Sequence, residues 1–132
     1  MFAQLLRTQR ETAYALLRLG SGSMFAFHGA QKILGVFGAS QPAVGTQMWV
    51  GGLIELIAGA AITLGSCTAW AAFLASGTMF VAYAQFHWKL AFGAQFFPAI
   101  NKGELALVYC LVFFYIACHG SGKWSLDARR HS

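Results

Sequence analysis

The sequence predicts an all-α integral membrane protein in which four helices form an up-down antiparallel bundle. The apolar residue types A, V, I, L, M, F, W, Y and C make up 58% of the 132 residues, and charged residues make up 10%, against about 25% in ordinary soluble domains. A chain of this length has too much surface for its volume to bury so much apolar area in water. The apolar residues also gather in four segments of about 20 residues, the length of helix that crosses a bilayer.

The charge pattern excludes several classes of soluble protein. Nine Lys and Arg residues against four Asp and Glu residues give a net charge of +5, and these charges are spread thinly along the chain. Because nucleic-acid-binding domains gather their basic residues on one face, this spread predicts no nucleic-acid partner. Membrane lipids are the predicted surroundings, and the same composition excludes disordered and collagen-like chains.

The first two predicted spans are interrupted by polar residues. The first covers about residues 12–34 and contains Arg18 and His28, and the second covers about 47–66 with Glu55 as its only charge. A secretory signal peptide has no charge within its apolar region, so Arg18 disfavours cleavage of this part of the chain. The sequence therefore predicts a first helix that spans the membrane.

The third and fourth predicted spans complete the domain. The third covers about residues 68–88, with no charge before His87, and the fourth covers about 102–119, with Glu104 near its start. The four spans use most of the chain, so they define one domain over residues 1–127. A short basic cytoplasmic tail is predicted at 128–132.

The connections and the positive charges give the predicted topology. Residues 65–67 form a very short link, so the second and third helices are expected to be antiparallel neighbours. The two chain ends together hold five Lys and Arg residues, whereas the opposite side holds three: Lys32, Lys89 and Lys102. Because cytoplasmic segments carry the excess of Lys and Arg, both termini are predicted to face the cytoplasm.

Cysteine and metal chemistry are not indicated by the spacing of the residues. Cys110 and Cys118 are eight residues apart on one predicted helix, which is about 12 Å along its axis and too far for a disulfide. The chain has no C-x-x-C, no E-x-x-H and no pair of ligands four residues apart on one predicted span. Neither a thiol relay nor a metal site is therefore predicted.

Polar groups from all four spans converge on one half of the membrane. Ionisable side chains inside a span are costly and usually face the interior of the bundle, so each is a candidate functional residue. With the termini cytoplasmic, five of them lie in the outer half: His28, Lys32, Glu55, His87 and Glu104. This convergence predicts a ligand site in that half of the bundle.

Glu55 carries the strongest single signal. The residues Gly51, Glu55, Gly59 and Thr63 are each four positions apart. Glu55 is therefore expected on a stripe of small residues where helices approach closely. A carboxylate at such a low dielectric needs a proton or a cationic partner. Two interpretations stay open: a group that accepts a proton or anchors a ligand, or a structural partner of another helix. The candidate partners are Arg18, Lys32 and His28.

The other candidate residues also have structural alternatives. Arg18 is expected to point inward nearer the cytoplasmic side, or else to extend to the lipid headgroups. His28 has the alternative role of a hydrogen-bonded packing residue. His87 and Glu104 lie close to the membrane interface, where polar residues cost little.

Four short motifs carry a resemblance to a known family. They are FHGAQKILGVFG at 27–38, GGLIELIAG at 51–59, GE at 103–104 and GSGKWSLD at 120–127. Each is weak alone, but in this order and spacing they resemble the DoxX family over about residues 14–127. The glycine-proline expected in the last motif reads Gly120-Ser121-Gly122 here.

The resemblance implies a four-helix bundle in the cell inner membrane. Founding members of the family are described as a subunit of a thiosulfate:quinone oxidoreductase, and others are linked to redox-stress membrane complexes. The positions that match the motifs are Arg18, His28, Gly29, Lys32, Gly35, Gly52, Glu55, Gly59, Glu104 and Asp127. Among these, the four glycines and Asp127 are expected to be structural.

The first hypothesis for function is a redox-associated membrane subunit that binds a quinone or a similar lipophilic ligand. His28 and Lys32 would hydrogen-bond an oxygen of the ligand, and Glu55 would exchange a proton, so Glu55 and His28 are the catalytic candidates. His87 or Glu104 would connect the site to the outer aqueous side. Arg18 completes the set of candidate ligand-binding residues.

The second hypothesis is a non-enzymatic accessory or assembly subunit of a larger membrane complex. The chain has little equipment for electron transfer alone, and its small-residue stripes suit contacts between helices. A homo-oligomer or a larger membrane redox complex is expected in either case, and whether the chain is itself an enzyme stays open. A small transporter is disfavoured because the sequence shows no internal repeat.

Overall fold

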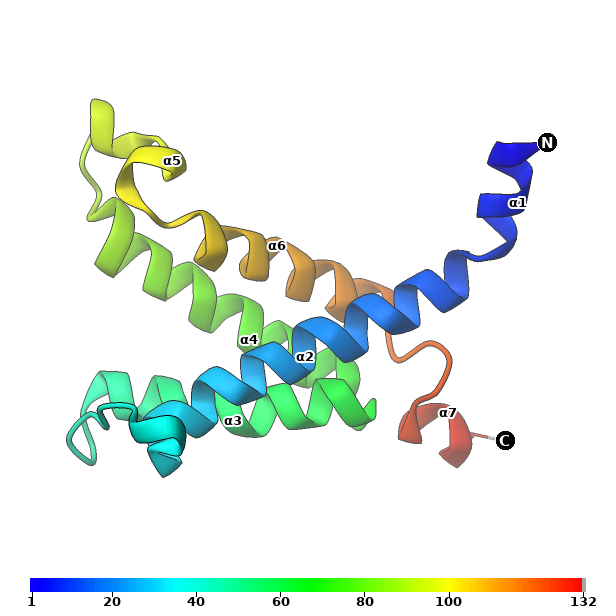
Figure 1. Ribbon diagram of the computed structural model, residues 1–132, viewed down its shortest axis with the longest axis horizontal. Coiled ribbons are helices and arrows are strands. Elements are labelled where there is room, and N and C mark those ends of the chain that lie inside the picture. The colour runs from blue at the N-terminus through cyan, green and yellow to red at the C-terminus, as the bar shows by residue number, and fades with distance from the viewer. Residues whose placement is uncertain (132) are drawn as a thin grey trace.

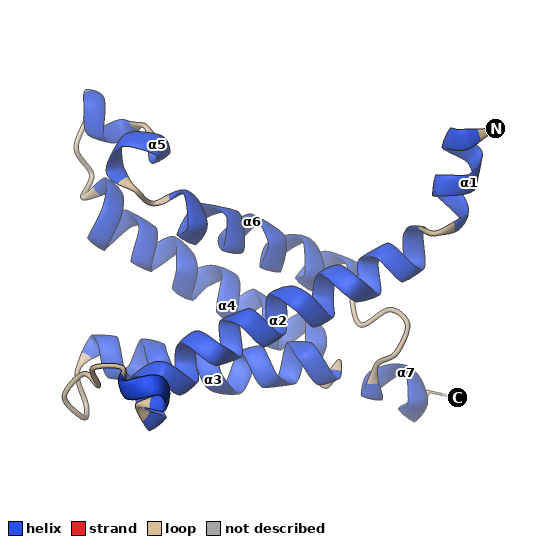
Figure 2. Ribbon diagram, viewed as in Figure 1, coloured by secondary structure: helices blue, strands red, loops and turns tan. Residues whose placement is uncertain are grey.

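The structure is a computed structural model that describes residues 1–131. These residues form helices, turns and loops without a strand (Figure 2), so the predicted all-α class is confirmed. The α-helices are α1 (Phe2–Thr8), α2 (Arg10–Leu34), α3 (Gln47–Leu64), α4 (Thr68–Ala82), α5 (Pro98–Asn101), α6 (Glu104–His119) and α7 (Leu126–Arg130). Three shorter elements join them: the 3-10 turns η1 (Val36–Gly38) and η3 (Ala94–Phe96), and the π-helix η2 (Tyr83–Trp88).

Local signals account for the ends of the long helices. Gly35 ends α2 with φ of 64° and Gly65 ends α3 with φ of 69°, a left-handed conformation that glycine adopts without strain. The hydroxyl of Thr46 accepts a hydrogen bond from the Trp49 N–H and so caps the start of α3. Proline 98 is the first residue of α5, the helical position at which its missing N–H costs least.

The long helices differ in small ways from the predicted spans. α2 begins at Arg10 and α6 begins at Glu104, and the last six residues of the third span form η2. α7 covers Leu126–Arg130 and so extends from the end of the predicted domain into the predicted tail at 128–132, whereas Ser132 lies outside the described residues. Within the described chain, one helix, α3, is long and apolar enough to cross a membrane, and α6 is apolar but shorter. The four-span topology stays a prediction.

The long helices pack as two pairs. α2 packs mainly against α3, and α4 packs mainly against α6, with fewer contacts between the pairs. Figure 1 shows α2 and α3 running in opposite directions, and the pair α4 and α6 diverging from them toward the end that carries η1 and α5. The pairs therefore meet at the narrow end, at the α3–α4 turn, and separate at the opposite end, here called the wide end.

Glycines bring α2 and α3 into close contact. A Cβ atom at Gly29 would overlap the backbone of Leu56, and one at Gly59 would overlap the backbone of Ala26. On α3, a Cβ at Gly52 would lie only 2.8 Å from the Cβ of Lys32. These positions accept no larger residue unless the helices move apart.

The predicted stripe of small residues on α3 is only partly at this contact. Gly59 lies against α2, but a Cβ at Gly51 would meet open space. Gly52, and not Gly51 as the spacing predicted, lies against α2. The reason is that the face of α3 that contains Gly52 packs on α2. Gly51 faces the space between the helix pairs instead.

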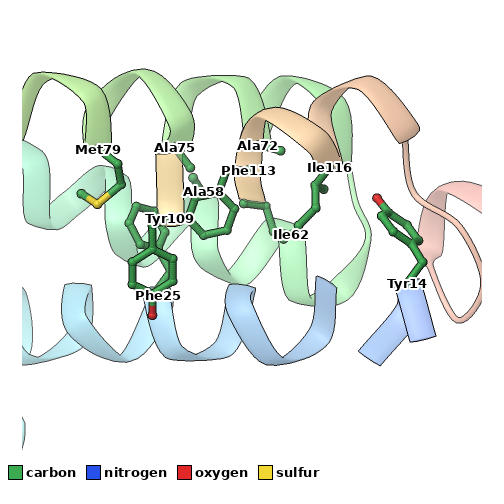
Figure 3. Close-up of a cluster of buried hydrophobic side chains, with 10 residues drawn as sticks. All are labelled: Tyr14, Phe25, Ala58, Ile62, Ala72, Ala75, Met79, Tyr109, Phe113 and Ile116. Carbon is green, nitrogen blue, oxygen red and sulfur yellow. The ribbon is translucent and has the colours of Figure 1, made fainter. Parts of the chain in front are cut away.

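Aromatic side chains fill the core between the pairs (Figure 3). The ring centroid of Phe25 on α2 lies 4.7 Å from that of Phe113 and 5.6 Å from that of Tyr109, both on α6. Small residues such as Ala72 and Ala75 on α4 are fully buried beside them. Large apolar side chains point outward as well, including Trp70, which is 80% exposed. Such a surface suits contact with lipid rather than water.

The close contact of α2 and α3 makes a direct prediction. Gly29→Ala should lower the free energy of unfolding by about 1–3 kcal/mol, because its methyl group would overlap the Leu56 backbone. Gly20→Ala is the matched control: Gly20 lies on the same helix with open space at its Cβ, so alanine should be neutral or stabilise by up to about 1 kcal/mol. Chemical denaturation in detergent, followed by circular dichroism, measures both; equal effects would contradict the contact.

Candidate functional site

A cavity of about 760 Å³ opens between the two helix pairs. Its walls are mostly apolar and include Phe25, Ile54, Phe73, Met79 and Leu105. Its lining residues with polar side chains are His28, Lys32, Gln47, Glu55, Thr78, His87, Lys102 and Tyr109. The cavity thus gathers four of the six predicted ligand-binding residues on one surface. Its volume lies within the range of about 300–1,000 Å³ that is usual for small-molecule sites.

An ion pair joins α2 to α3 at the wall of the cavity. Lys32 Nζ donates a hydrogen bond to Glu55 Oε1 at 2.6 Å. The Glu55 side chain is 5% exposed, whereas that of Lys32 is 34% exposed. Gly52 lies one turn before Glu55, and its missing side chain leaves the space that the Lys32 side chain occupies. Of the three candidate partners of Glu55, Lys32 is the one that pairs with it in the structure.

The second oxygen of Glu55 has no partner. Oε2 is buried and accepts no hydrogen bond from any described residue. A buried carboxylate oxygen without a donor is costly, so a proton or a hydrogen-bond donor at Oε2 would stabilise the site. Glu55 therefore has one oxygen that is bonded to Lys32 and one buried oxygen that has no hydrogen-bond partner among the described residues.

His28 and Tyr109 form a wall between two spaces. Both line the cavity, and both also line a groove between α2 and α6. Their ring centroids are 6.4 Å apart, with the rings edge to face. The sequence identified His28 as a candidate but not Tyr109, since nothing in the spacing distinguishes Tyr109 from the other tyrosines of the chain.

A buried asparagine shapes the opening of the cavity at the wide end. The Asn101 side chain donates to the Tyr83 hydroxyl at 3.2 Å and to the Gln95 carbonyl at 3.0 Å, and it accepts from the Gly103 N–H at 2.9 Å. His87 Nδ1 lies 3.4 Å from the Asn101 carbonyl oxygen. These contacts hold the turn that places Lys102 on the cavity lining. The sequence predicted neither Asn101 nor Lys102 as a site residue, although both directly precede the Gly-Glu motif.

Arg18 lies away from the cavity. It is fully buried, and its Nη1 donates to the carbonyls of Ile62 and Thr63, both at 2.7 Å. Its Nη2 donates to the carbonyls of Lys123 and Trp124, both at 2.9 Å. The guanidinium thus joins the last turn of α3, where helix carbonyls lack partners, to the C-terminal segment. Glu104 is exposed at the start of α6 and does not line the cavity either.

Asp127 completes this junction at the narrow end. Its carboxylate accepts hydrogen bonds from the Cys67 N–H at 2.9 Å, and from the Thr68 N–H and hydroxyl at 3.0 and 2.9 Å. The Asp127 N–H donates to the Gly65 carbonyl at 2.8 Å. The hydrogen bond from the Thr68 backbone, more than any other contact, lowers the pKa of Asp127. A residue of α7 therefore caps the first turn of α4.

The remaining predicted structural residues lie at helix contacts and helix ends. Gly29, Gly52 and Gly59 lie between α2 and α3, and Gly35 ends α2. No three His, Cys, Asp or Glu side chains gather in a group within residues 1–131.

Comparison with known proteins identifies relatives of the chain. A family model described as DoxX matches residues 13–88. A protein of Haemophilus influenzae, described as an uncharacterized protein, is 37% identical to this chain over an alignment of 127 residues. The alignment covers 92% of this chain and 93% of that protein. No solved structure matches the chain.

The ion pair makes a prediction that separates charge pairing from packing. Lys32→Met should lower the free energy of unfolding by about 2 kcal/mol, because it leaves the Glu55 carboxylate buried without its cation. The double variant Lys32→Met with Glu55→Gln should recover part of that loss, since no buried charge then remains. Denaturation of the wild type, Lys32→Met, Glu55→Gln and the double variant in one detergent gives the coupling energy; purely additive effects would contradict the pair. Lys89→Met, at an exposed lysine outside the cavity lining, is the control.

The cap formed by Asp127 makes a prediction about pH. Because its pKa lies below the ordinary 3.8 in the folded protein, the carboxylate stabilises the fold above about pH 4 and loses this effect as the pH falls through the lowered pKa. Asp127→Asn should therefore cost about 1 kcal/mol at pH 7 and progressively less as the pH falls below the ordinary value of 3.8. Thermal unfolding across this pH range measures the difference, with the exposed Glu104→Gln as control. A pH-independent cost would contradict the role of the charge.

Proposed function

Because the chain belongs to the DoxX family and is thus a membrane protein, we propose that it is redox-associated and binds a quinone or similar lipophilic ligand in the cavity between its helix pairs. The observation that carries this proposal is the buried, unpartnered Glu55 Oε2 at the wall of a largely apolar cavity. Apolar walls with a few polar groups at one end are the usual anatomy of such a site.

The proposed setting is the cell inner membrane. In it, α2, α3, α4 with η2, and α6 cross the bilayer as one domain over residues 1–127, with both termini and the basic tail in the cytoplasm. Exposed apolar side chains on these helices, such as Trp70, Leu111 and Phe114, support contact with lipid acyl chains. The wide end then lies in the outer half of the membrane, and the Arg18 junction lies toward the cytoplasm.

The residues of the cavity fit a quinone by their chemistry. The ring and tail of a quinone are apolar and match walls formed by Phe25, Ile54 and Met79, and its oxygens accept hydrogen bonds. His28 and Lys32 are the donors proposed for those oxygens. Bound there, a quinone supplies two-electron redox chemistry; the chain supplies a proton site at Glu55 Oε2. His87 is the proposed connection to the outer aqueous side, since it lines the cavity and Glu104 does not.

An accessory role in a larger membrane complex is the alternative. The groove between α2 and α6, lined by residues such as Gly20, Met24 and Val108, gives a partner helix a surface with small residues. Stoichiometric co-purification with larger subunits in mild detergent favours this alternative. A homo-oligomer that retains a lipophilic ligand favours the first proposal.

A cavity-filling substitution tests the proposed function. Gly51 lines the cavity with open space at its Cβ, so Gly51→Leu should fill the cavity without disturbing the helix contacts. We expect it to weaken binding of the short-chain quinone ubiquinone-1, measured by quenching of tryptophan fluorescence, at least tenfold, which is about 1.4 kcal/mol.

Two further variants make this test specific. Gly20→Leu is the matched control, because Gly20 also has open space but lines the groove between α2 and α6; it should leave quinone binding unchanged. Glu55→Gln should alter the pH dependence of binding, because it removes the proton site at Oε2. Unchanged binding in Gly51→Leu would refute the proposed location of the ligand.

A further inference from the structure

The polar end of the cavity has an excess of positive charge. Its charged lining residues are Lys32, Lys102 and Glu55. Because Lys32 already pairs with Glu55 at 2.6 Å, these two charges largely cancel. Lys102 is then the remaining cation, and no described residue pairs with its ammonium group. Glu104, the acidic residue of α6, does not line the cavity.

The other polar lining groups add hydrogen-bond donors rather than negative charge. Gln47 donates its amide to the Gln85 side chain at 2.5 Å, and His87 directs Nδ1 toward the Asn101 carbonyl. His28 makes a ring contact with Tyr109 and no hydrogen bond with a described residue. His28 and His87 therefore each keep a ring nitrogen for a ligand, and either becomes a further cationic donor when protonated.

The turn that carries Lys102 is held firmly in place. Lys102 has φ of 60°, a left-handed conformation that costs a residue with a side chain about 1–2 kcal/mol. The hydrogen bonds of the buried Asn101 side chain hold the chain in this conformation. Gly103 adds to this, since a Cβ there would lie 2.6–2.7 Å from atoms of Tyr83 and His87. The backbone of Lys102 is thus held beside the cavity by a buried network, and its side chain is exposed at the cavity lining.

We propose that the ligand of this cavity is a lipophilic anion, with its acidic group at Lys102 and His87 and its apolar part against Phe25 and Met79. The proposal rests on the proposed function and names the charge of the ligand. An anion is favoured because Lys102 is exposed at the cavity lining without a described partner, so a carboxylate or phosphate forms a charge-assisted hydrogen bond with its ammonium group that a neutral ligand cannot match. A free lipophilic acid and an anionic lipid headgroup share this chemistry.

A matched pair of probes tests the charge of the ligand. The full chain in nanodiscs of zwitterionic lipid is titrated with the fluorescent fatty acid cis-parinaric acid and with its neutral methyl ester. We expect the acid to bind about tenfold more tightly than the ester, and this preference to fall as salt concentration rises. Equal affinity for the acid and the ester would overturn the proposal.

Substitutions at two lysines test whether Lys102 causes the preference for the acid over the ester. Lys102→Gln should weaken binding of the acid about tenfold and leave that of the ester unchanged, and Lys102→Arg should retain the preference. Lys89→Gln is the matched control, because Lys89 has the same left-handed conformation, with φ of 55°, but does not line the cavity. A preference for the acid that survives Lys102→Gln would refute the assignment of Lys102.

The outcomes separate this proposal from the proposed function. Binding of ubiquinone-1 without any preference for the acid overturns the anionic ligand and leaves the proposed function standing. No binding of ubiquinone-1, the acid or the ester overturns both. A repeat in nanodiscs that contain phosphatidylglycerol identifies the source of the anion: competition supports a lipid headgroup, and unchanged binding of the acid supports a free lipophilic acid.

Discussion

The buried guanidinium of Arg18 is the constraint on which the arrangement of the helices depends. A fully buried cation needs hydrogen-bond acceptors. Nη1 and Nη2 of Arg18 find them in backbone carbonyls of α3 and of the C-terminal segment, whereas the buried Nε has no partner among the described residues. Arg18 therefore holds three parts of the chain at one point. Asp127 adds the start of α4 to the same junction. The narrow end is closed by these polar contacts, and the cavity lies where they are absent.

The wide end has a different kind of organisation. α2 and α3 pack closely because glycines leave no side chains between them. The Lys32–Glu55 ion pair adds a polar link between the same two helices. α4 and α6 instead diverge from that pair (Figure 1). Three lining groups of the cavity, His28, Lys32 and Glu55, thus stand on a rigid base, while Lys102 stands on the opposite wall. A ligand that touches both walls would bridge the two helix pairs.

Much of the fold could be predicted from the sequence because its signals are local. Apolar segments, the glycines that end α2 and α3, and the composition indicate helices whatever surrounds them. Glu55 was predictable as a candidate for the same reason, since a lone carboxylate in an apolar segment is costly wherever it packs. Its partner was not, because the choice among Arg18, Lys32 and His28 depends on the room that Gly52 leaves on the facing helix.

The contacts that the sequence could not predict join distant parts of the chain. Arg18 was expected among the ligand-binding residues, yet its partners at Lys123 and Trp124 are more than a hundred residues away. Spacing along one helix contains no information about such partners. Lys102 and Asn101 were missed for a related reason: a turn between helices shows no periodicity, and its place beside the cavity follows only from the packing of α5 against η2.

The partners of Arg18 also determine an order of events during synthesis. Residues 62 and 63 leave the ribosome long before residues 123 and 124, so for part of translation the guanidinium has only half of its carbonyl acceptors. Closing so long a loop is slow compared with the formation of a helix. Until its last segment arrives, the nascent chain must therefore meet the remaining hydrogen-bond demand of Arg18 with water or another group, and the junction at the narrow end closes only when the chain is nearly complete.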